Sequence, residues 1–205
     1  MTRVYFVRHA QPEHDWEEDR TRPLTEEGKK DSAIVLEFLK DKKIDAFYCS
    51  PYKRSMDTIA EAADFFTKEI ITDERLRERE KGLDGNNHGM FRKRRADHNY
   101  HEEGGESIAM VQKRNIEALN EILSDNTDKD IVIGTHGTAL STILNFYDSN
   151  FGCEDFLRII DWMPYIIELD FESSCNEMES ECPSYSFKLI GKQEHCYIEK
   201  KFKGK

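Results

Sequence analysis

The chain has 205 residues, of which 38% are hydrophobic and 35% charged, a very polar composition that still suits a globular protein with one full core. Its formal net charge of −11 at pH 7 argues against nucleic acid or an anionic membrane as a partner, so any anionic ligand must be attracted by a local basic patch. No apolar run approaches membrane-spanning length, and the five cysteines lack close pairs. This cysteine pattern favours reduced thiols and a cytoplasmic location over a disulfide framework or a zinc site.

Two apolar runs are each followed by a histidine within three residues. Residues 4–7 are apolar and β-favouring, which is typical of a strand buried on both faces of a parallel sheet, and Arg8 and His9 follow at once. This run lies so near the N-terminus that we expect no signal peptide. Residues 131–133 repeat the pattern before His136. Because open α/β sheets bind ligands at the carboxyl ends of their strands, these side chains indicate a site for an anion. The alternative is two ordinary strand ends that carry polar residues.

A long polar loop and a helix follow the first strand. The loop covers residues 11–23 and is rich in acidic side chains, so it is either functional or a solvated surface loop. Thr25 is a suitable N-cap, and acidic residues in the next turn favour the positive end of the helix dipole. We predict that this helix continues through Lys40, because its apolar residues recur at helical spacing.

A second strand and helix bring an arginine towards the same sheet edge. Residues 44–49 predict a strand, after which Ser50 is expected to cap a helix and Pro51 to take its first position. Arg54 lies about one turn into this helix. Since helical side chains lean towards the N-terminus, Arg54 should point back to the edge that carries His9. A simple surface arginine is the alternative that this spacing also allows.

The remaining segments complete the predicted fold. Residues 74–106 predict an irregular insertion over the site, with a short helix near residues 89–98; the arginines of residues 92–95 either attract a phosphate ester or form an exposed charged face. Further strands are predicted over residues 69–72, 163–171, 185–190 and 196–198, and further helices over residues 107–123 and 138–147. Residues 172–181 predict an exposed hairpin loop and residues 200–205 a disordered tail. Without a repeat or a linker, residues 1–205 are predicted to form a single domain.

Taken together, these segments resemble the histidine phosphatase superfamily, also called the phosphoglycerate mutase-like family. Six motifs carry the resemblance in the family's order: Arg8-His9-Ala10, Leu24-Thr25-Glu26-Glu27-Gly28, Ser50-Pro51-Tyr52-Lys53-Arg54, Leu76-Arg77-Glu78 with Gly82, Gly105-Glu106-Ser107, and His136-Gly137. The resemblance implies a three-layer α/β/α sandwich with a mostly parallel central sheet and an irregular or helical insertion over the active site.

Three positions depart from the family's pattern. Ala10 replaces the usual glycine and adds a methyl group where the backbone meets the ligand. Asp15 falls near a position where many members carry asparagine, which would put a negative charge near the phosphate. Ser55 and Ile59 replace small alanines after the second arginine. None of these changes removes a catalytic group.

The resemblance implies a phosphohistidine mechanism with His9 as the nucleophile. Arg8 and Arg54 would each offer paired N–H donors to the phosphate, and His136 would add another donor if it is protonated. The helix after Gly137 would direct free backbone N–H groups to the same place. We expect no metal and no cofactor, because the arginines would neutralise the phosphate charge.

Glu78 is the candidate acid that protonates the leaving oxygen. A carboxyl group in an enclosed site near phosphate would have a raised pKa, and once ionised it could activate the hydrolytic water. Glu80 is the rival, because only the family motif favours Glu78. In a purely structural role, Glu78 would pair with Arg75 or Arg79.

The function predicted first is a phosphomonoesterase that hydrolyses a small phosphorylated metabolite and releases inorganic phosphate. The second is a phosphoglycerate mutase-type phosphotransferase, since the pairs Glu78-Arg79 and Arg94-Arg95 resemble mutases and the arginine pair could hold a carboxylate. The third is a phospho-ligand-binding protein without turnover, against which the retention of His9, Glu78 and His136 argues. The physiological substrate and the oligomeric state stay open at this point.

Overall fold

The structure is a computed structural model that describes residues 1–83, 89–175 and 185–200. Its described strands form one sheet in the order β3-β2-β4-β1-β5-β6. The strands are β1 (Thr2–Arg8), β2 (Ala46–Cys49), β3 (Ile70–Thr72), β4 (Asp130–Thr135), β5 (Trp162–Cys175) and β6 (Tyr185–Glu199). Neighbours are parallel from β3 through β1, whereas β5 pairs antiparallel with both β1 and β6. The sheet is therefore mostly parallel, with an antiparallel edge.

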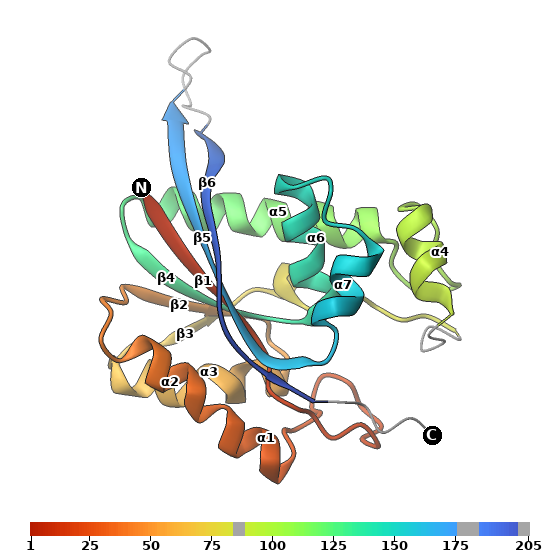
Figure 1. Cartoon of the computed structure of the whole chain (residues 1–205), viewed down its shortest axis with the longest axis horizontal. Coiled ribbons are helices and arrows are strands. Elements are labelled where there is room, and N and C mark those ends of the chain that lie inside the picture. The colour runs from red at the N-terminus through yellow and green to blue at the C-terminus, as the bar shows by residue number, and fades with distance from the viewer. Residues whose placement is uncertain (84–88, 176–184, 201–205) are drawn as a thin grey trace.

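Helices cover both faces of this sheet (Figure 1). One face carries α1 (Glu26–Asp31), α2 (Ala33–Leu39) and α3 (Lys53–Phe65), and the other carries α5 (Ile108–Asp125), α6 (Gly137–Tyr147) and α7 (Cys153–Ile159). Alternate residues of β1 point to opposite faces: Val4 and Phe6 pack with the α5–α6 layer, whereas Tyr5 and Val7 pack with the α2–α3 layer. This arrangement confirms the predicted three-layer α/β fold.

Residues 74–106 lie between β3 and α5, where they interrupt the regular alternation of strands and helices, as expected of an insertion. They contain a 3-10 turn at Glu74–Leu76 and the short helix α4 (Met90–Ala96), which lies beside α7 (Figure 1). Helix α5 then begins after Ser107, whose Oγ accepts a hydrogen bond from the Met110 N–H at 3.2 Å. Part of the insertion, residues 84–88, lies outside the described residues.

Several predicted boundaries were wrong. The first helix divides at Ser32, whose hydroxyl donates to the Lys29 carbonyl oxygen at 2.7 Å and competes with the regular helical bonds. The two last predicted strands are one strand, because residues 191–194 between them also pair with β5, with a register shift on either side. Helix α7 was not predicted. Strand β5 extends to Cys175, so the expected hairpin loop does not include residues 172–175. The rest of that loop and residues 201–205 of the tail lie outside the described residues.

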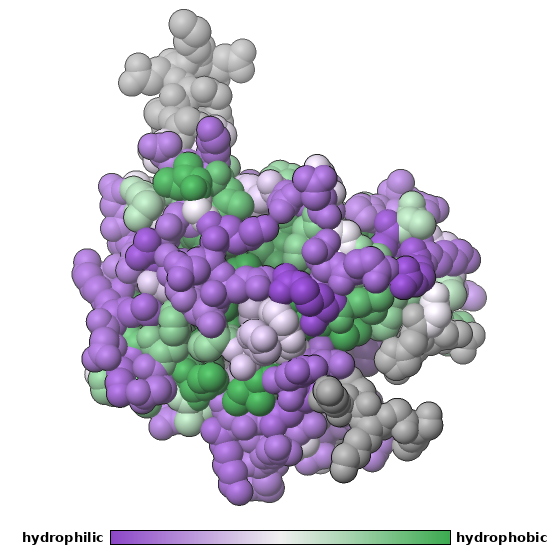
Figure 2. Space-filling model, viewed as in Figure 1, coloured by the Kyte–Doolittle hydropathy of each residue, from purple (hydrophilic) through white to green (hydrophobic). Residues whose placement is uncertain are grey.

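Hydrophilic side chains cover most of the molecular face in Figure 2, with small apolar areas between them, in keeping with the polar composition. Among the described residues, no helix combines the length and the apolar character that crossing a bilayer requires.

Candidate active site

The carboxyl ends of β1 and β4 bring the two predicted histidines together. These strands are adjacent and parallel, with Arg8 opposite Thr135, and the His9 N–H donates to the Thr135 carbonyl oxygen at 3.1 Å. The ring centroids of His9 and His136 are 5.2 Å apart. Both rings are buried, and the charges of Arg8 and Arg54 act on both. The structure therefore gathers two histidines and two arginines from distant parts of the chain in one buried cluster.

The contacts of His9 select one tautomer of its imidazole. Its Nδ1 lies 2.7 Å from the carbonyl oxygen of Ala10; a carbonyl can only accept, so Nδ1 carries the proton and Nε2 keeps a lone pair. Ala10 is itself fixed, because its N–H donates to the Thr58 Oγ1 at 3.0 Å. Burial, together with the charges of Arg54 and Arg8, holds the pKa of His9 well below 6.5. The imidazole is consequently neutral near neutral pH, which is the nucleophilic form.

The guanidinium of Arg8 lies against Gly137 at the start of α6. Its Nη1 donates to the Ile159 carbonyl oxygen at 2.6 Å, whereas its buried Nε has no hydrogen-bond partner among the described residues. A Cβ at Gly137 would lie 3.2 Å from three atoms of this guanidinium, so the glycine leaves room for it. Burial lowers the pKa of Arg8 to about 10, and the side chain stays charged near neutrality. A buried cation with an unpartnered donor suits an anionic ligand.

Arg54 points back to the sheet edge, as its place in α3 predicted. The residue is only 3% exposed, and its Nη1 donates to the carbonyl oxygen of Asp19 at 2.7 Å and lies 3.4 Å from the Asp19 carboxylate. The acidic residue beside this arginine is thus Asp19, whereas Asp15 is exposed. The sequence analysis pointed to Asp15 and did not predict Asp19, because the position of Asp19 depends on the path of loop 11–23.

His136 is fully buried between Ser50 and Tyr52. Its Nε2 lies 2.7 Å from the Ser50 Oγ, and the Tyr52 ring packs edge-on at a centroid distance of 5.2 Å. Ser50 does not cap α3 as predicted, since that helix begins at Lys53 with Tyr52 as its N-cap. Its hydroxyl instead orients the histidine, whose Nδ1 is buried without a partner in the described part of the chain. Burial and the nearby arginines lower the pKa of His136 well below 6.5, so it is neutral near neutral pH.

Glu78 caps the N-terminus of α6. Its two carboxylate oxygens accept hydrogen bonds from the N–H groups of Thr138 at 3.0 Å and Ala139 at 3.2 Å, and the Arg79 N–H adds a third bond at 2.8 Å. The expectation that these helix N–H groups are free for phosphate was therefore wrong. Arg75 does not pair with Glu78 and is held by Asp73 and Glu121. The capped carboxylate lies close enough to Arg8 and Arg54 for its charge to act on both.

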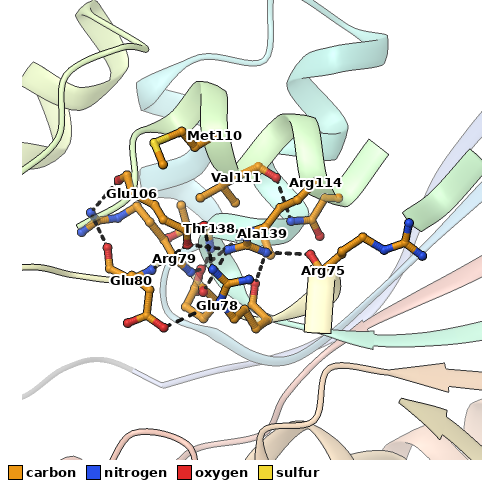
Figure 3. A network of polar contacts seen from close by, with 12 residues as sticks. Arg75, Glu78, Arg79, Glu80, Glu106, Met110, Val111, Arg114, Thr138 and Ala139 are labelled. Atoms are coloured by element: carbon orange, nitrogen blue, oxygen red, sulfur yellow. Dashed lines mark hydrogen bonds and ion pairs between the residues drawn. The ribbon is translucent and has the colours of Figure 1, made fainter. Parts of the chain in front are cut away.

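A buried ion pair between Arg114 and Glu106 holds the backbone that carries Glu78 (Figure 3). Arg114, from α5, donates to the carbonyl oxygens of Arg75 at 2.6 Å, Arg77 at 2.8 Å and Glu78 at 3.1 Å. Although burial alone would raise it, the hydrogen bond from Arg114 and its charge lower the pKa of Glu106, which stays ionised. This network explains the Gly-Glu-Ser motif: its glutamate fixes the loop of the candidate acid. The sequence motif pointed to Glu106, but it could not identify Arg114 as the partner of this glutamate.

The rival carboxylate and the arginine pair of the insertion occupy different positions. Glu80 has a half-exposed side chain that contacts the Tyr52 hydroxyl at 3.4 Å. Arg94 is buried in an ion pair with Glu102, whereas Arg95 reaches the Ser141 hydroxyl on α6 and keeps a buried Nη1 without a partner among the described residues. Burial lowers the pKa of Arg95 to about 10, and the charge of Glu78 acts on it. Only Arg95 of this pair is directed towards the site.

Comparisons with known proteins give matches in both sequence and structure. The family model described as histidine phosphatase superfamily (branch 1) matches residues 4–160. The chain is 28% identical over 153 residues to phosphoserine phosphatase 1 of Hydrogenobacter thermophilus, which covers 66% of this chain and 71% of that protein. Another curated relative from the same organism is 37% identical over 83 residues, and the match spans 40% of that relative's length.

Solved structures share the fold. A mycobacterial glucosyl-3-phosphoglycerate phosphatase superposes with a TM-score of 0.68 at 18% identity, over 82% of this chain and 89% of that one. A phosphoserine phosphatase variant from Entamoeba histolytica, solved in complex with phosphoserine, superposes with a TM-score of 0.69 at 22% identity, over 84% of this chain and 92% of that one.

Proposed function

Because the chain belongs to the histidine phosphatase superfamily, we propose that it is a phosphomonoesterase that transfers the phosphate of a small metabolite to His9 and then to water. The observation that carries this proposal is a neutral histidine, with its Nε2 lone pair retained, inside a cluster that leaves the Arg8 Nε and the His136 Nδ1 buried without partners among the described residues. Buried polar atoms of this kind require a ligand or water, and a phosphate oxygen would accept from the Arg8 Nε and from the His136 Nδ1 once that nitrogen carries a proton. The phosphatase names of the relatives support the same class of reaction.

The proposed reaction has two displacements at phosphorus. First, when the phosphate dianion binds beside it, Glu78 takes up a proton from solvent. The Nε2 lone pair of His9 then forms the N–P bond while the bond from phosphorus to the ester oxygen breaks, and Glu78 gives this proton to that leaving oxygen. Second, ionised Glu78 takes a proton from water, the water oxygen attacks phosphorus, and the N–P bond breaks. Inorganic phosphate leaves and His9 is regenerated.

Neutralisation of the phosphate charge is assigned to side chains of the chain itself. Arg8 and Arg54 supply two permanent cations in a buried site, where charge–charge interactions are stronger than in water. Phosphate would also favour protonation of His136, which then adds a third donor. We therefore propose a reaction that requires no metal and no cofactor.

The phosphoglycerate mutase alternative receives less support from the insertion. The predicted arginine pair is split, because Arg94 is occupied by Glu102 and only Arg95 is directed towards α6. We propose that Arg95 contacts the leaving group next to Glu78.

A cytoplasmic location is proposed as well, since Cys49, Cys153 and Cys196 are free thiols. We propose no nucleic-acid or membrane partner, on the grounds of the net charge of −11.

Phosphate release from a panel of phosphorylated metabolites, measured with EDTA present, tests the proposed function. The wild-type protein should release phosphate at the same rate with and without EDTA, and His9→Ala should lower turnover by at least about 10⁴-fold. Loss of activity with EDTA that a divalent ion restores would contradict the metal-free reaction. Interconversion of 2- and 3-phosphoglycerate in place of phosphate release would favour the mutase alternative.

A further inference from the structure

Three cations converge on one carboxylate oxygen at the mouth of the site. The Oδ1 of Asp19 lies 3.1 Å from the Arg22 Nη1, 3.4 Å from the Arg54 Nη1 and 3.7 Å from the Lys81 Nζ. These side chains come from three segments: the loop after β1, the first turn of α3, and the insertion. A single oxygen that faces three cations occupies the position that an anionic ligand would take.

The three positive charges around Asp19 outnumber its single negative charge. Desolvation and the charges of Arg22 and Arg54 lower the pKa of Lys81, although Asp19 and Glu78 act in the opposite direction. Arg22 is mostly buried, and its Nε has no hydrogen-bond partner among the described residues. The cluster thus retains donors and positive charge that one aspartate does not satisfy.

Arg54 connects this cluster with the proposed phosphate position. Its guanidinium lowers the pKa of His9 and at the same time contacts Asp19. A phosphate bound to Arg8 and Arg54 would therefore bring the rest of its molecule next to Arg22 and Lys81. Asp19 is able to leave, since 29% of its side chain is exposed and it belongs to the long loop 11–23.

We propose that Arg22 and Lys81 form a subsite for a second anionic group on the substrate, and that Asp19 fills this subsite when no ligand is bound. This inference rests on the proposed function and narrows it. The substrate class becomes a phosphomonoester that carries an additional carboxylate or phosphate, which displaces the Asp19 carboxylate from its cations. Arg22 and Lys81 are thus specificity-determining residues, and neither touches the reacting phosphorus.

Matched ligands test the subsite by calorimetry on the His9→Ala protein, which binds without turnover. 3-Phosphoglycerate and glycerol 3-phosphate share a skeleton and differ in one carboxylate; fructose 1,6-bisphosphate and fructose 6-phosphate differ in one phosphate. The more acidic member of at least one pair should bind about tenfold more tightly or better, which is the usual worth of a charge-assisted hydrogen bond. The pair that shows the preference identifies the second group as carboxylate or phosphate.

Additional substitutions assign that preference to residues. Arg22→Gln and Lys81→Gln should each reduce the ratio of the two dissociation constants by about tenfold. Arg20→Gln should not, because Arg20 carries the same charge on the same loop but pairs with Glu74 at the surface. Asp19→Asn should tighten binding of the more acidic ligand, whereas the exposed Asp15→Asn should leave it unchanged.

The outcomes of these experiments distinguish failure of the subsite from failure of the proposed reaction. Equal binding within both pairs, or a preference that survives both Arg22→Gln and Lys81→Gln with unchanged melting temperatures, would overturn the subsite. Hydrolysis of these esters by the wild-type protein in that case would leave the proposed function standing. Conversely, a preference that depends on Arg22 and Lys81 in a protein that hydrolyses no ester would support the subsite and reject the proposed function.

Discussion

At the residue scale, His9, the proposed nucleophile, is held and kept neutral by its immediate neighbours. The Ala10 carbonyl oxygen holds the His9 Nδ1 proton, and the Thr58 hydroxyl holds Ala10. Burial and two arginines keep the imidazole neutral. In the proposed reaction the same arginines bind the phosphate, so one pair of cations would both bind the ligand and keep His9 unprotonated. His136 shares this environment but has its Nε2 at the Ser50 hydroxyl, which suits a donor better than a nucleophile.

A pH titration measures the effect of Arg54 on His9. Since the pKa of His9 is lowered, its imidazole should become protonated only below pH 6.5, and activity that needs the neutral ring should fall in that acidic range. Arg54→Gln removes a nearby positive charge, so the pKa of His9 should move upwards. NMR of the His9 ring, assigned by its loss in His9→Gln, reports the midpoint. Lys53→Gln is the control, because Lys53 is half exposed and pairs with Asp57. A midpoint that stays in place or moves down in Arg54→Gln would be inconsistent with this account.

Residues that follow a buried strand were predictable, whereas residues on long loops were not. Arg8 and His9 directly follow one apolar run and His136 lies three residues after another, and the register of parallel strands then brings them together. Asp19 and Arg22 reach the site only through the path of a loop whose sequence shows no periodicity. Their positions depend on tertiary contacts, which no local pattern encodes.

At the scale of elements, the start of helix α6 contacts both Arg8 and Glu78. Gly137 leaves room for the Arg8 guanidinium, and the next two N–H groups bind the carboxylate of Glu78. On the other side, helix α5 contributes Arg114, which holds the backbone of residues 75–78. The candidate acid is thus positioned by two helices, although it lies on an irregular segment.

The dependence of the rate on the leaving group tests the role of Glu78. Glu78→Gln should slow hydrolysis of an alkyl phosphate by about 10²–10⁴-fold, because an alkoxide needs a proton to leave. It should slow p-nitrophenyl phosphate by less than about tenfold, because that leaving group is already stable as an anion. Glu80→Gln provides the control and should affect both esters slightly and equally. Equal losses on both esters in Glu78→Gln would show that Glu78 is not the acid.

The predicted elements succeeded where periodicity was strong. Helix α5 agrees with the amphipathic pattern of its sequence, and β1 and β4 agree with their apolar runs. Helix α7 was missed because it has only seven residues, too few to display a clear period. Strand β6 was divided because Gly191 and charged neighbours interrupt its alternation, although pairing with β5 continues across them.

The molecule as a whole combines an acidic chain with a cationic site. The formal net charge is −11, yet Arg8, Arg54 and Arg22 gather around one end of the sheet. This local excess attracts anions that the rest of the surface repels, and the repulsion disfavours large polyanions. The site is also assembled from the whole length of residues 8–159, which agrees with the extent of the family match at residues 4–160.

Rapid-quench labelling tests the central claim most directly. The wild-type protein, mixed with an ester labelled in its phosphate and quenched in alkali during turnover, should carry label on His9 that acid releases. Mass spectrometry of the alkaline digest should place the phosphate on the peptide with His9, and Arg8→Ala should diminish it together with turnover. Fast turnover with no phosphate on His9, or with the label on His136 instead, would contradict the account.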